Sequence, residues 1–233
     1  MKNKIQLLIV ILTFFSINGY GQTVLLKVDQ EKENIYNRGP NTEKFSLFFF
    51  KFGFALPPDQ EQSRVVFENS VYMSFGFRKK YKLSKFYSMG WDLQSEFSDW
   101  KIKQVKSKTF PDTLTSWDVQ RFDVGAFAIS YFNRFNFDPK RGNTMGVFLD
   151  VGIIGKYNYS MVQIEKREVK IGYATTSTNN LAYTNKFQSD VFFRAGKGRV
   201  SLWATYRITD LFKPSFGFKE LPRTVAGIEV GLY

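Results

Sequence analysis

The chain has 233 residues, of which 43% are hydrophobic and 18% aromatic, and its formal net charge is +12. The length suits one domain, and the apolar content excludes a disordered chain. The absence of cysteine and histidine excludes disulfide bridges and any catalytic or metal site that depends on histidine, so we expect no cofactor and no metal.

The first 21 residues predict an export signal. Lys2 and Lys4 precede an apolar run over residues 5–17, and small residues follow in NGYGQ. This order is typical of a cleaved signal peptide, with cleavage near Gly21. A retained membrane anchor is the alternative. The basic surplus of an exported chain favours outer-membrane lipid and lipopolysaccharide phosphates as counterions over nucleic acid.

Residues 22–43 are mostly polar and end at a Gly-Pro pair. We interpret them as a periplasmic N-terminal segment that precedes a single domain over residues 44–233. A short additional strand over residues 23–28 is the alternative.

Strand periodicity begins at residue 44. In FYSMGWDLQSEF, residues 86–97, Trp91 and Leu93 alternate with Asp92 and Gln94, as expected where successive side chains point to opposite faces. All eight segments exceed the about 5–6 residues of ordinary strands and are long enough for the about 9–11 that cross a bilayer. The predicted segments are 45–56, 70–78, 86–99, 118–132, 144–160, 181–194, 199–211 and 224–233.

The connections between these segments alternate between short and long. Outer-membrane barrels have short periplasmic turns, longer external loops and both ends of the barrel in the periplasm. The alternation has the phase that this arrangement requires. The sequence therefore predicts an all-β fold, an eight-stranded antiparallel transmembrane β-barrel located in the outer membrane.

The polar faces of the segments mix glycine with charges of both signs. An eight-stranded barrel has room inside only for side chains, and glycines leave space for long basic ones. We expect an ion-pair network in the lumen, with the apolar faces turned to lipid. Its predicted acids are Asp92, Glu96, Asp123, Asp150, Asp190 and Glu229, and its predicted bases are Arg121, Lys156, Lys186, Arg194, Arg199 and Arg207.

Aromatic residues near the segment ends predict girdles at the two membrane boundaries. The candidates are Trp117, Tyr157 and Tyr159 on the outer side, and Tyr81, Phe132, Phe135 and Phe137 on the inner side. A water-soluble barrel of lipocalin type, with its apolar faces inside, is the alternative to the membrane interpretation.

The end of the chain resembles a known family. In RVSLWATYRITDLFKPSFGFKELPRTVAGIEVGLY, residues 199–233, a strand is followed by a Y-x-I-T-D-LF-K segment and a final x-G-I-x-V-G strand. This pattern is similar to PorT-like outer-membrane barrels of Bacteroidota. The resemblance implies an eight-stranded barrel without catalytic residues, and some proteins of the wider group take part in type IX secretion.

We therefore expect a barrel that is not an enzyme, and that acts as a structural or partner-binding subunit of an envelope assembly such as a secretion machine. Other envelope proteins are the expected partners, and a small channel, a lipid-binding barrel or a soluble carrier are the alternatives.

A lumen ion-pair network explains Asp92 with Glu96 better than acid–base catalysis does. A loop cluster that could meet lipopolysaccharide or a protein is predicted from Lys101, Lys103, Lys106 and Lys108.

Overall fold

The computed structural model describes residues 39–56, 65–66, 69–105, 108, 110–111 and 117–233. The predicted signal peptide and most of the segment 22–43 lie outside these residues. The described strands are β1 (Lys44–Leu56), β2 (Val71–Lys82), β3 (Tyr87–Ile102), β4 (Val119–Asn136), β5 (Val147–Val169), β6 (Gly172–Asn179), β7 (Phe187–Lys197), β8 (Val200–Arg207) and β9 (Thr224–Leu232).

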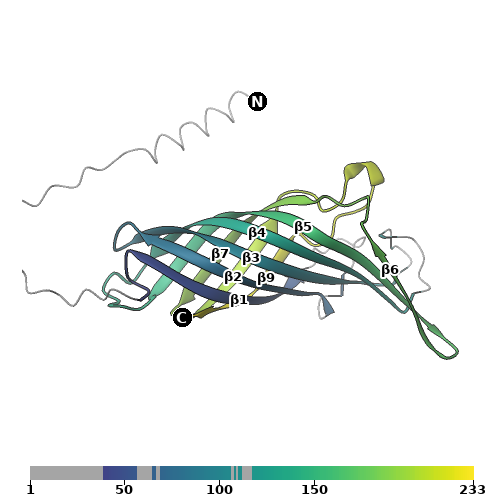
Figure 1. Ribbon diagram of the computed structural model, residues 1–233, viewed down its shortest axis with the longest axis horizontal. Helices are drawn as coiled ribbons and strands as arrows, with labels where there is room; N and C mark the ends of the chain where they lie inside the picture. Colours follow the sequence, from purple (N-terminus) through teal and green to yellow (C-terminus); the bar gives the residue numbers. More distant parts are fainter. Residues whose placement is uncertain (1–38, 57–64, 67–68, 106–107, 109, 112–116) are drawn as a thin grey trace, which may run out of the picture. The chain divides into compact units, whose positions relative to one another are not determined.

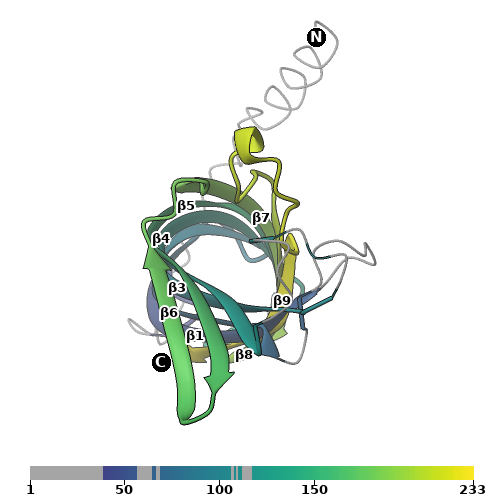
Figure 2. The same ribbon diagram turned by 90° about the vertical axis from the view of Figure 1, so that its right-hand side faces the viewer.

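The strands form one antiparallel sheet that closes on itself (Figures 1 and 2). Neighbouring strands run in the order β4-β3-β2-β1-β9-β8-β7-β5, and a further pairing of β4 with β5 completes a ring of eight strands. The remaining strand, β6, pairs with the end of β5 and extends as a hairpin beyond the ring. Among the described residues, no helix has the length and hydropathy to cross a membrane.

The predicted all-β antiparallel class is confirmed, with differences at the loop end. The region 161–180, predicted to be a connection, instead forms the β5–β6 hairpin. The strand predicted over 181–194 begins only at Phe187, and the one predicted over 199–211 ends at Arg207.

The two ends of the ring differ in the length of their connections. Short connections, which contain Lys85, Lys140 and Arg199, lie at one end, which we call the turn end. The longer connections lie at the other end, which we call the loop end.

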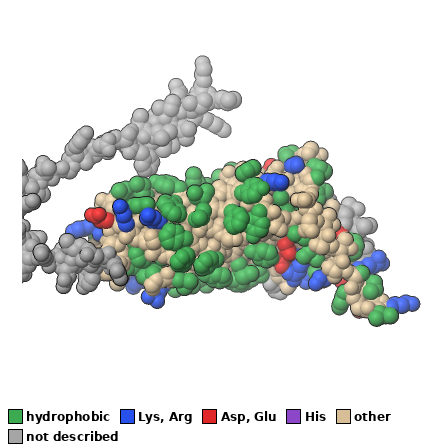
Figure 3. Space-filling model, in the orientation of Figure 1, with side chains coloured by type: hydrophobic (Ala, Val, Ile, Leu, Met, Phe, Trp, Pro, Cys, Tyr) green, Lys and Arg blue, Asp and Glu red, His purple; other side chains and the backbone are tan. Residues whose placement is uncertain are grey.

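Alternation along the strands separates an apolar outside from a polar inside. On β3, Leu93 is 55% exposed whereas Asp92 is fully buried. On β5, Ile153 is 61% exposed and Asp150 is fully buried. The apolar outer face continues around the ring, and Figure 3 shows hydrophobic side chains along the middle of one face. Its exposed members include Phe48, Phe50, Phe75, Phe127, Ile129, Phe193, Leu202, Ile228 and Val230.

Strand β4 corrects one part of the prediction. Its loop-end half turns Phe122 and Val124 into the ring, and Arg121 and Asp123 outward. The sequence rule places apolar residues outside, but here the interior is itself apolar, so the two faces are exchanged. Phe132 is also fully buried inside and is not a girdle residue.

The apolar interior at the loop end is an aromatic cap. The ring centroids of Phe110 and Phe212 lie 4.3 Å apart in a tilted arrangement, and both rings pack against Phe122 of β4. Trp100 and Leu221 join the same buried cluster. Side chains from two connections and several strands thus fill the loop end.

The turn end is held by the segment before β1. Lys80 of β2, whose side chain is buried inside the ring, donates to the carbonyl of Pro40. Arg141 Nη2 donates to Asn41 Oδ1 at 2.9 Å. Asn41 Nδ2 in turn donates to the carbonyl of Gly142 at 2.5 Å. Residues 39–43 are therefore fixed to β2 and to the β4–β5 connection.

Candidate functional site

The middle of the ring contains arginine–carboxylate pairs. Arg78 of β2 binds Asp92 of β3 through Nε at 2.8 Å and Nη2 at 3.0 Å, and it binds Glu229 of β9 through Nη1 at 2.7 Å. Arg134 of β4 binds Asp150 of β5 in the same two-pronged way, at 2.6 and 2.8 Å. Such bidentate pairs fix both the distance and the orientation of the groups.

Arg194 of β7 connects these pairs. Its Nη2 lies 2.5 Å from Asp150, and its Nη1 lies 3.2 Å from Asp92 and 3.1 Å from Glu229. These four side chains are almost completely buried. One guanidinium thus links carboxylates from three strands that are not sequence neighbours.

Aromatic rings enclose the guanidinium groups. Arg78 lies 4.5 Å from the centroid of Phe49, and Arg134 lies 3.8 Å from that of Phe148. Arg194 lies 5.1 Å from the centroid of Phe132. The negative faces of these rings provide cation–π contacts and exclude water from the ion pairs.

A second cluster surrounds Lys156 of β5. Its Nζ lies 2.6 Å from Glu96 and 2.6 Å from Asp190. Gln94 of β3 bridges the two clusters, because it accepts from Lys51 at 2.9 Å and donates to Glu96 at 2.6 Å.

The two clusters balance each other in charge. The first joins Lys51, Arg78, Arg134 and Arg194 to Asp92, Asp150 and Glu229, and the second joins Lys156 to Glu96 and Asp190. The first cluster has one more base than it has acids, and the second has one more acid than it has bases. Together they are neutral, which limits the electrostatic cost of burying them.

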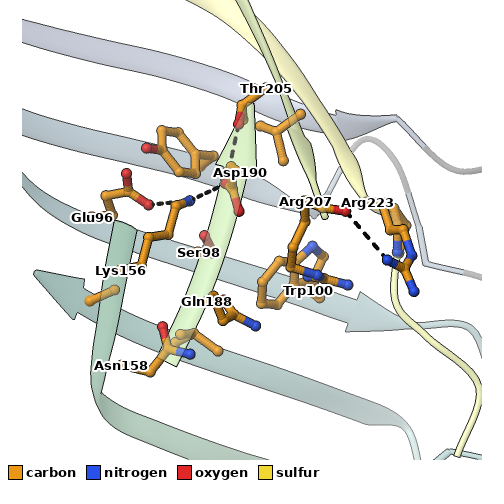
Figure 4. A pocket seen from close by; sticks show the side chains of 15 residues that line it. Glu96, Ser98, Trp100, Lys156, Asn158, Gln188, Asp190, Thr205, Arg207 and Arg223 are labelled. Carbon is orange, nitrogen blue, oxygen red and sulfur yellow. Dashed lines mark hydrogen bonds and ion pairs between the residues drawn. The ribbon is translucent and has the colours of Figure 1, made fainter. Parts of the chain in front are cut away.

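A small cavity of about 30 Å³ lies between the Lys156 cluster and the loop end (Figure 4). Among the residues that line it, Asp190 Oδ1, Asn158 Oδ1, Gln188 Nε2 and Arg207 Nε are buried without a hydrogen-bond partner. Arg223, also at its wall, donates to the carbonyls of Arg207 and Ile208. The cavity therefore combines unused donors with unused acceptors.

Most of the predicted network residues lie inside the ring. Seven of the carboxylates and bases that the sequence placed there form the pairs described above. They are Asp92, Glu96, Asp150, Lys156, Asp190, Arg194 and Glu229. Arg207 is also buried, but it pairs with Glu220 of the following connection at 2.7 Å.

Four predicted members lie elsewhere. Arg121 and Asp123 face outward, where Arg121 pairs with Asp99 of β3. Lys186 is exposed in the segment before β7, and Arg199 is exposed in the β7–β8 turn. Lys186 and Arg199 lie outside the strands, so alternation does not determine their direction.

Sequence reasoning missed three central bases. Arg78 lies on the polar face of its predicted segment, so alternation alone could have placed it in the interior. Arg134 lies beyond the predicted segment end at residue 132, although β4 continues to Asn136. Lys51 interrupts the run FFFKFGF, whose aromatic residues on both faces hide the alternation.

The described members of the predicted loop cluster differ in burial. Lys103 is exposed and Lys101 half-buried, but Lys108 is buried and donates to Gln120 Oε1 at 2.7 Å. Lys106 lies outside the described residues. Of the described members, Lys108 thus does not share an exposed surface with Lys101 and Lys103.

Two groups outside the strands have shifted pKa values. Burial raises the pKa of Tyr183 above its usual range, and the nearby carboxylate of Glu165 adds to the effect. Tyr183 donates to Gln163 Oε1 at 2.7 Å and packs under the aromatic cap. Burial lowers the pKa of Arg141 at the turn end. Both groups have structural hydrogen-bond partners.

The interior has the chemistry of a static ion-pair network. Among the described residues, no group of three acidic side chains is arranged to hold a metal ion. Each carboxylate of the Arg194 cluster accepts from at least one guanidinium, and the histidine that a common acid–base mechanism uses is absent from the sequence.

No family model, curated protein or solved structure matches the chain.

Proposed function

We propose that the chain is a transmembrane β-barrel of an outer membrane. The observation that carries this proposal is the polarity of the closed sheet: exposed Phe, Leu, Ile and Val surround it, while a neutral ion-pair network fills its centre. Strands that cross lipid must satisfy every backbone group, which a closed sheet does. An apolar band outside and a polar interior are the pattern of such barrels.

The filled interior favours a structural role over a channel. Arg194 and Asp150 are fully buried, and the aromatic cap and residues 39–43 occupy the two ends. Eight strands leave room only for side chains. The barrel therefore acts as an anchor within an envelope assembly rather than as a pore or an enzyme. A secretion machine of type IX is the assembly that the sequence resemblance suggests.

The β5–β6 hairpin favours a partner on the loop side. It extends past the ring, and Ile171 at its tip is 97% exposed, with Tyr173 beside it. Polar and apolar side chains of the hairpin both face solvent. Because exposed large apolar groups mark interaction sites, we place the partner-binding surface here.

Membrane fractionation of the producing cells, combined with gel migration of unheated and heated samples, tests the membrane assignment. We expect recovery in the outer-membrane fraction and faster migration of the unheated form. Recovery in the soluble periplasmic fraction would overturn the proposal and favour a carrier. Planar bilayers that contain the purified chain are expected to show no steady conductance, and stable unitary currents would favour a channel.

The partner role needs a separate test. A photo-crosslinking amino acid at Tyr173, on the hairpin, is expected to capture a defined envelope protein that mass spectrometry identifies. The same amino acid at Phe127, in the outer apolar band, is the control and is expected to capture lipid. If both positions give the same products, the hairpin has no specific partner.

A further inference from the structure

The turn end of the ring has many more basic than acidic side chains. We call six of them the turn-end bases, because each is exposed or half-buried at this end: Lys44, Lys79, Lys85, Lys140, Lys197 and Arg199. The acidic side chains described nearby are Glu43 and Asp138. Within the part of the chain that the structure describes, no ion pair includes a turn-end base.

The turn-end bases adjoin the outer apolar band. On β2, Lys79 follows Phe77 on the same outward face. On β7, Lys197 lies between two exposed valines, Val147 of β5 and Val200 of β8. Figure 3 shows basic side chains beside hydrophobic ones at the left-hand end. A lysine in this position keeps its stem on the apolar surface while its ammonium group reaches the polar boundary.

Two of these bases also contact aromatic rings. Lys79 Nζ lies 5.7 Å from the ring centroid of Tyr81, and the Arg199 guanidinium lies 4.9 Å from that of Tyr233. Tyrosine rings are favoured where lipid meets water. Charge and aromatic side chains therefore occur together at the same level of the ring.

The distribution of the bases favours a lipid partner over a protein. Lys44 and Lys79 lie on β1 and β2, Lys140 lies in the β4–β5 connection, and Lys197 and Arg199 lie at the β7–β8 turn. They thus surround the ring. A protein partner would need basic side chains on only one side of the ring, whereas a lipid leaflet contacts the ring on every side.

We propose that the turn-end bases bind the phosphate headgroups of anionic phospholipids in the leaflet that this end of the barrel occupies. The phosphate oxygens accept hydrogen bonds from ammonium and guanidinium groups, and the negative surface potential of such a leaflet adds attraction. This inference rests on the proposed membrane insertion and adds a lipid preference to it.

The full chain, folded into phosphatidylcholine bilayers that contain a minority of phosphatidylglycerol, tests the inference. Spin-labelled forms of both lipids report which one is immobilised at the protein surface. We expect phosphatidylglycerol to be immobilised preferentially, and high salt to weaken the preference because exposed charges are screened. Heat-modifiable gel migration on the same samples reports insertion independently of lipid preference.

A matched pair of triple variants locates the site. The change of Lys85, Lys140 and Arg199 to Gln removes three turn-end charges in connections, where the sheet is not altered. The change of Lys166, Arg167 and Lys170 to Gln removes the same charge from the exposed β5–β6 hairpin. We expect the first variant to lower the preference at least about twofold, since one base near an anionic surface is worth a factor of about five. The hairpin variant should leave it unchanged.

The outcomes separate the two proposals. Failure to insert into any bilayer overturns the proposed function. Insertion with equal immobilisation of both lipids leaves the proposed function standing and overturns the lipid inference, as does an equal loss of preference in the two variants.

Discussion

Arg78 and Glu229 lie 151 residues apart in the chain and meet inside the ring through two hydrogen bonds, 2.7 Å from Nη1 to Oε1 and 2.9 Å from Nη2 to Oε2. Strand β1 lies between β2 and β9 in the sheet, so this pair bridges strands that share no backbone hydrogen bonds. Lys51 of β1 is 3.9 Å from the same carboxylate. One acid thus joins three consecutive strands.

Glu229→Gln should destabilise the ring strongly. The amide keeps the shape of the side chain but removes one of the carboxylates that Arg78 and Arg194 share, so the buried cluster carries one surplus positive charge. Removing one partner of a buried pair costs about 3–5 kcal/mol. Urea unfolding of the chain in lipid vesicles measures the loss.

Glu168→Gln on the exposed hairpin is the control for that measurement, with an expected change within about 0.5 kcal/mol. Equal losses in both variants would show that the interior network contributes nothing particular to stability.

Ile153→Arg tests whether the outer face of β5 meets lipid. An arginine near the middle of a lipid-facing strand costs about 2–4 kcal/mol. The unfolding free energy in vesicles should fall by that amount. Ile171→Arg, at the tip of the hairpin, should be neutral because Ile171 lies beyond the ring. A stable Ile153→Arg chain with improved solubility in water would instead favour a soluble barrel.

Gly227→Ala should weaken the contact between β9 and β1. Gly227 faces Gly53 across the two strands, and an added Cβ would overlap the carbonyl oxygen of Phe52. On the partner strand, a Cβ added at Gly53 would likewise overlap the Trp203 ring. We expect a loss of about 1–3 kcal/mol from this overpacking.

Gly155→Ala is the comparison, because a Cβ there meets nothing within 4 Å. Thermal unfolding followed by circular dichroism measures both variants. A Gly227→Ala chain as stable as Gly155→Ala would mean that the strands separate there at little cost.

The cavity beside Lys156 should hold ordered water. Its volume of about 30 Å³ suits about two water molecules, each of which needs about 10–15 Å³ and several polar partners. The unpaired atoms Asp190 Oδ1, Asn158 Oδ1 and Gln188 Nε2 supply those partners. A crystal structure at a resolution that shows water is expected to place it there, and density for a single ion within coordination distance of Asp190 would contradict the prediction.

The sequence predicted the ring best where one rule held over a whole strand. Over residues 87–97 of β3 and 226–232 of β9, every outward residue is apolar, aromatic or small and every inward one is polar or glycine, so Asp92 and Glu229 were placed correctly. The same rule failed for Arg121 and Asp123, because the interior changes from charged to aromatic near Phe122. Periodicity reports that two faces differ, but it does not report which face is inside.

Other features had no periodic signal. The hairpin of β5 and β6 mixes polar and apolar side chains on both faces because both meet solvent, so it was predicted to be a connection. The pairing of Lys108 with Gln120 depends on how a connection folds back over the ring, which local spacing does not encode.

The pairing of β1 with β9 has a consequence for how the protein reaches its folded state. Phe52 lies opposite Ile228, so this pairing joins segments at the two ends of the domain, and its large sequence separation raises the contact order. Until that contact forms, both edge strands display unpaired amides and carbonyls that hydrocarbon cannot satisfy and that other chains can capture. For the membrane insertion that we propose, closure and entry into lipid must therefore proceed together, and the open intermediate is the species most prone to aggregate.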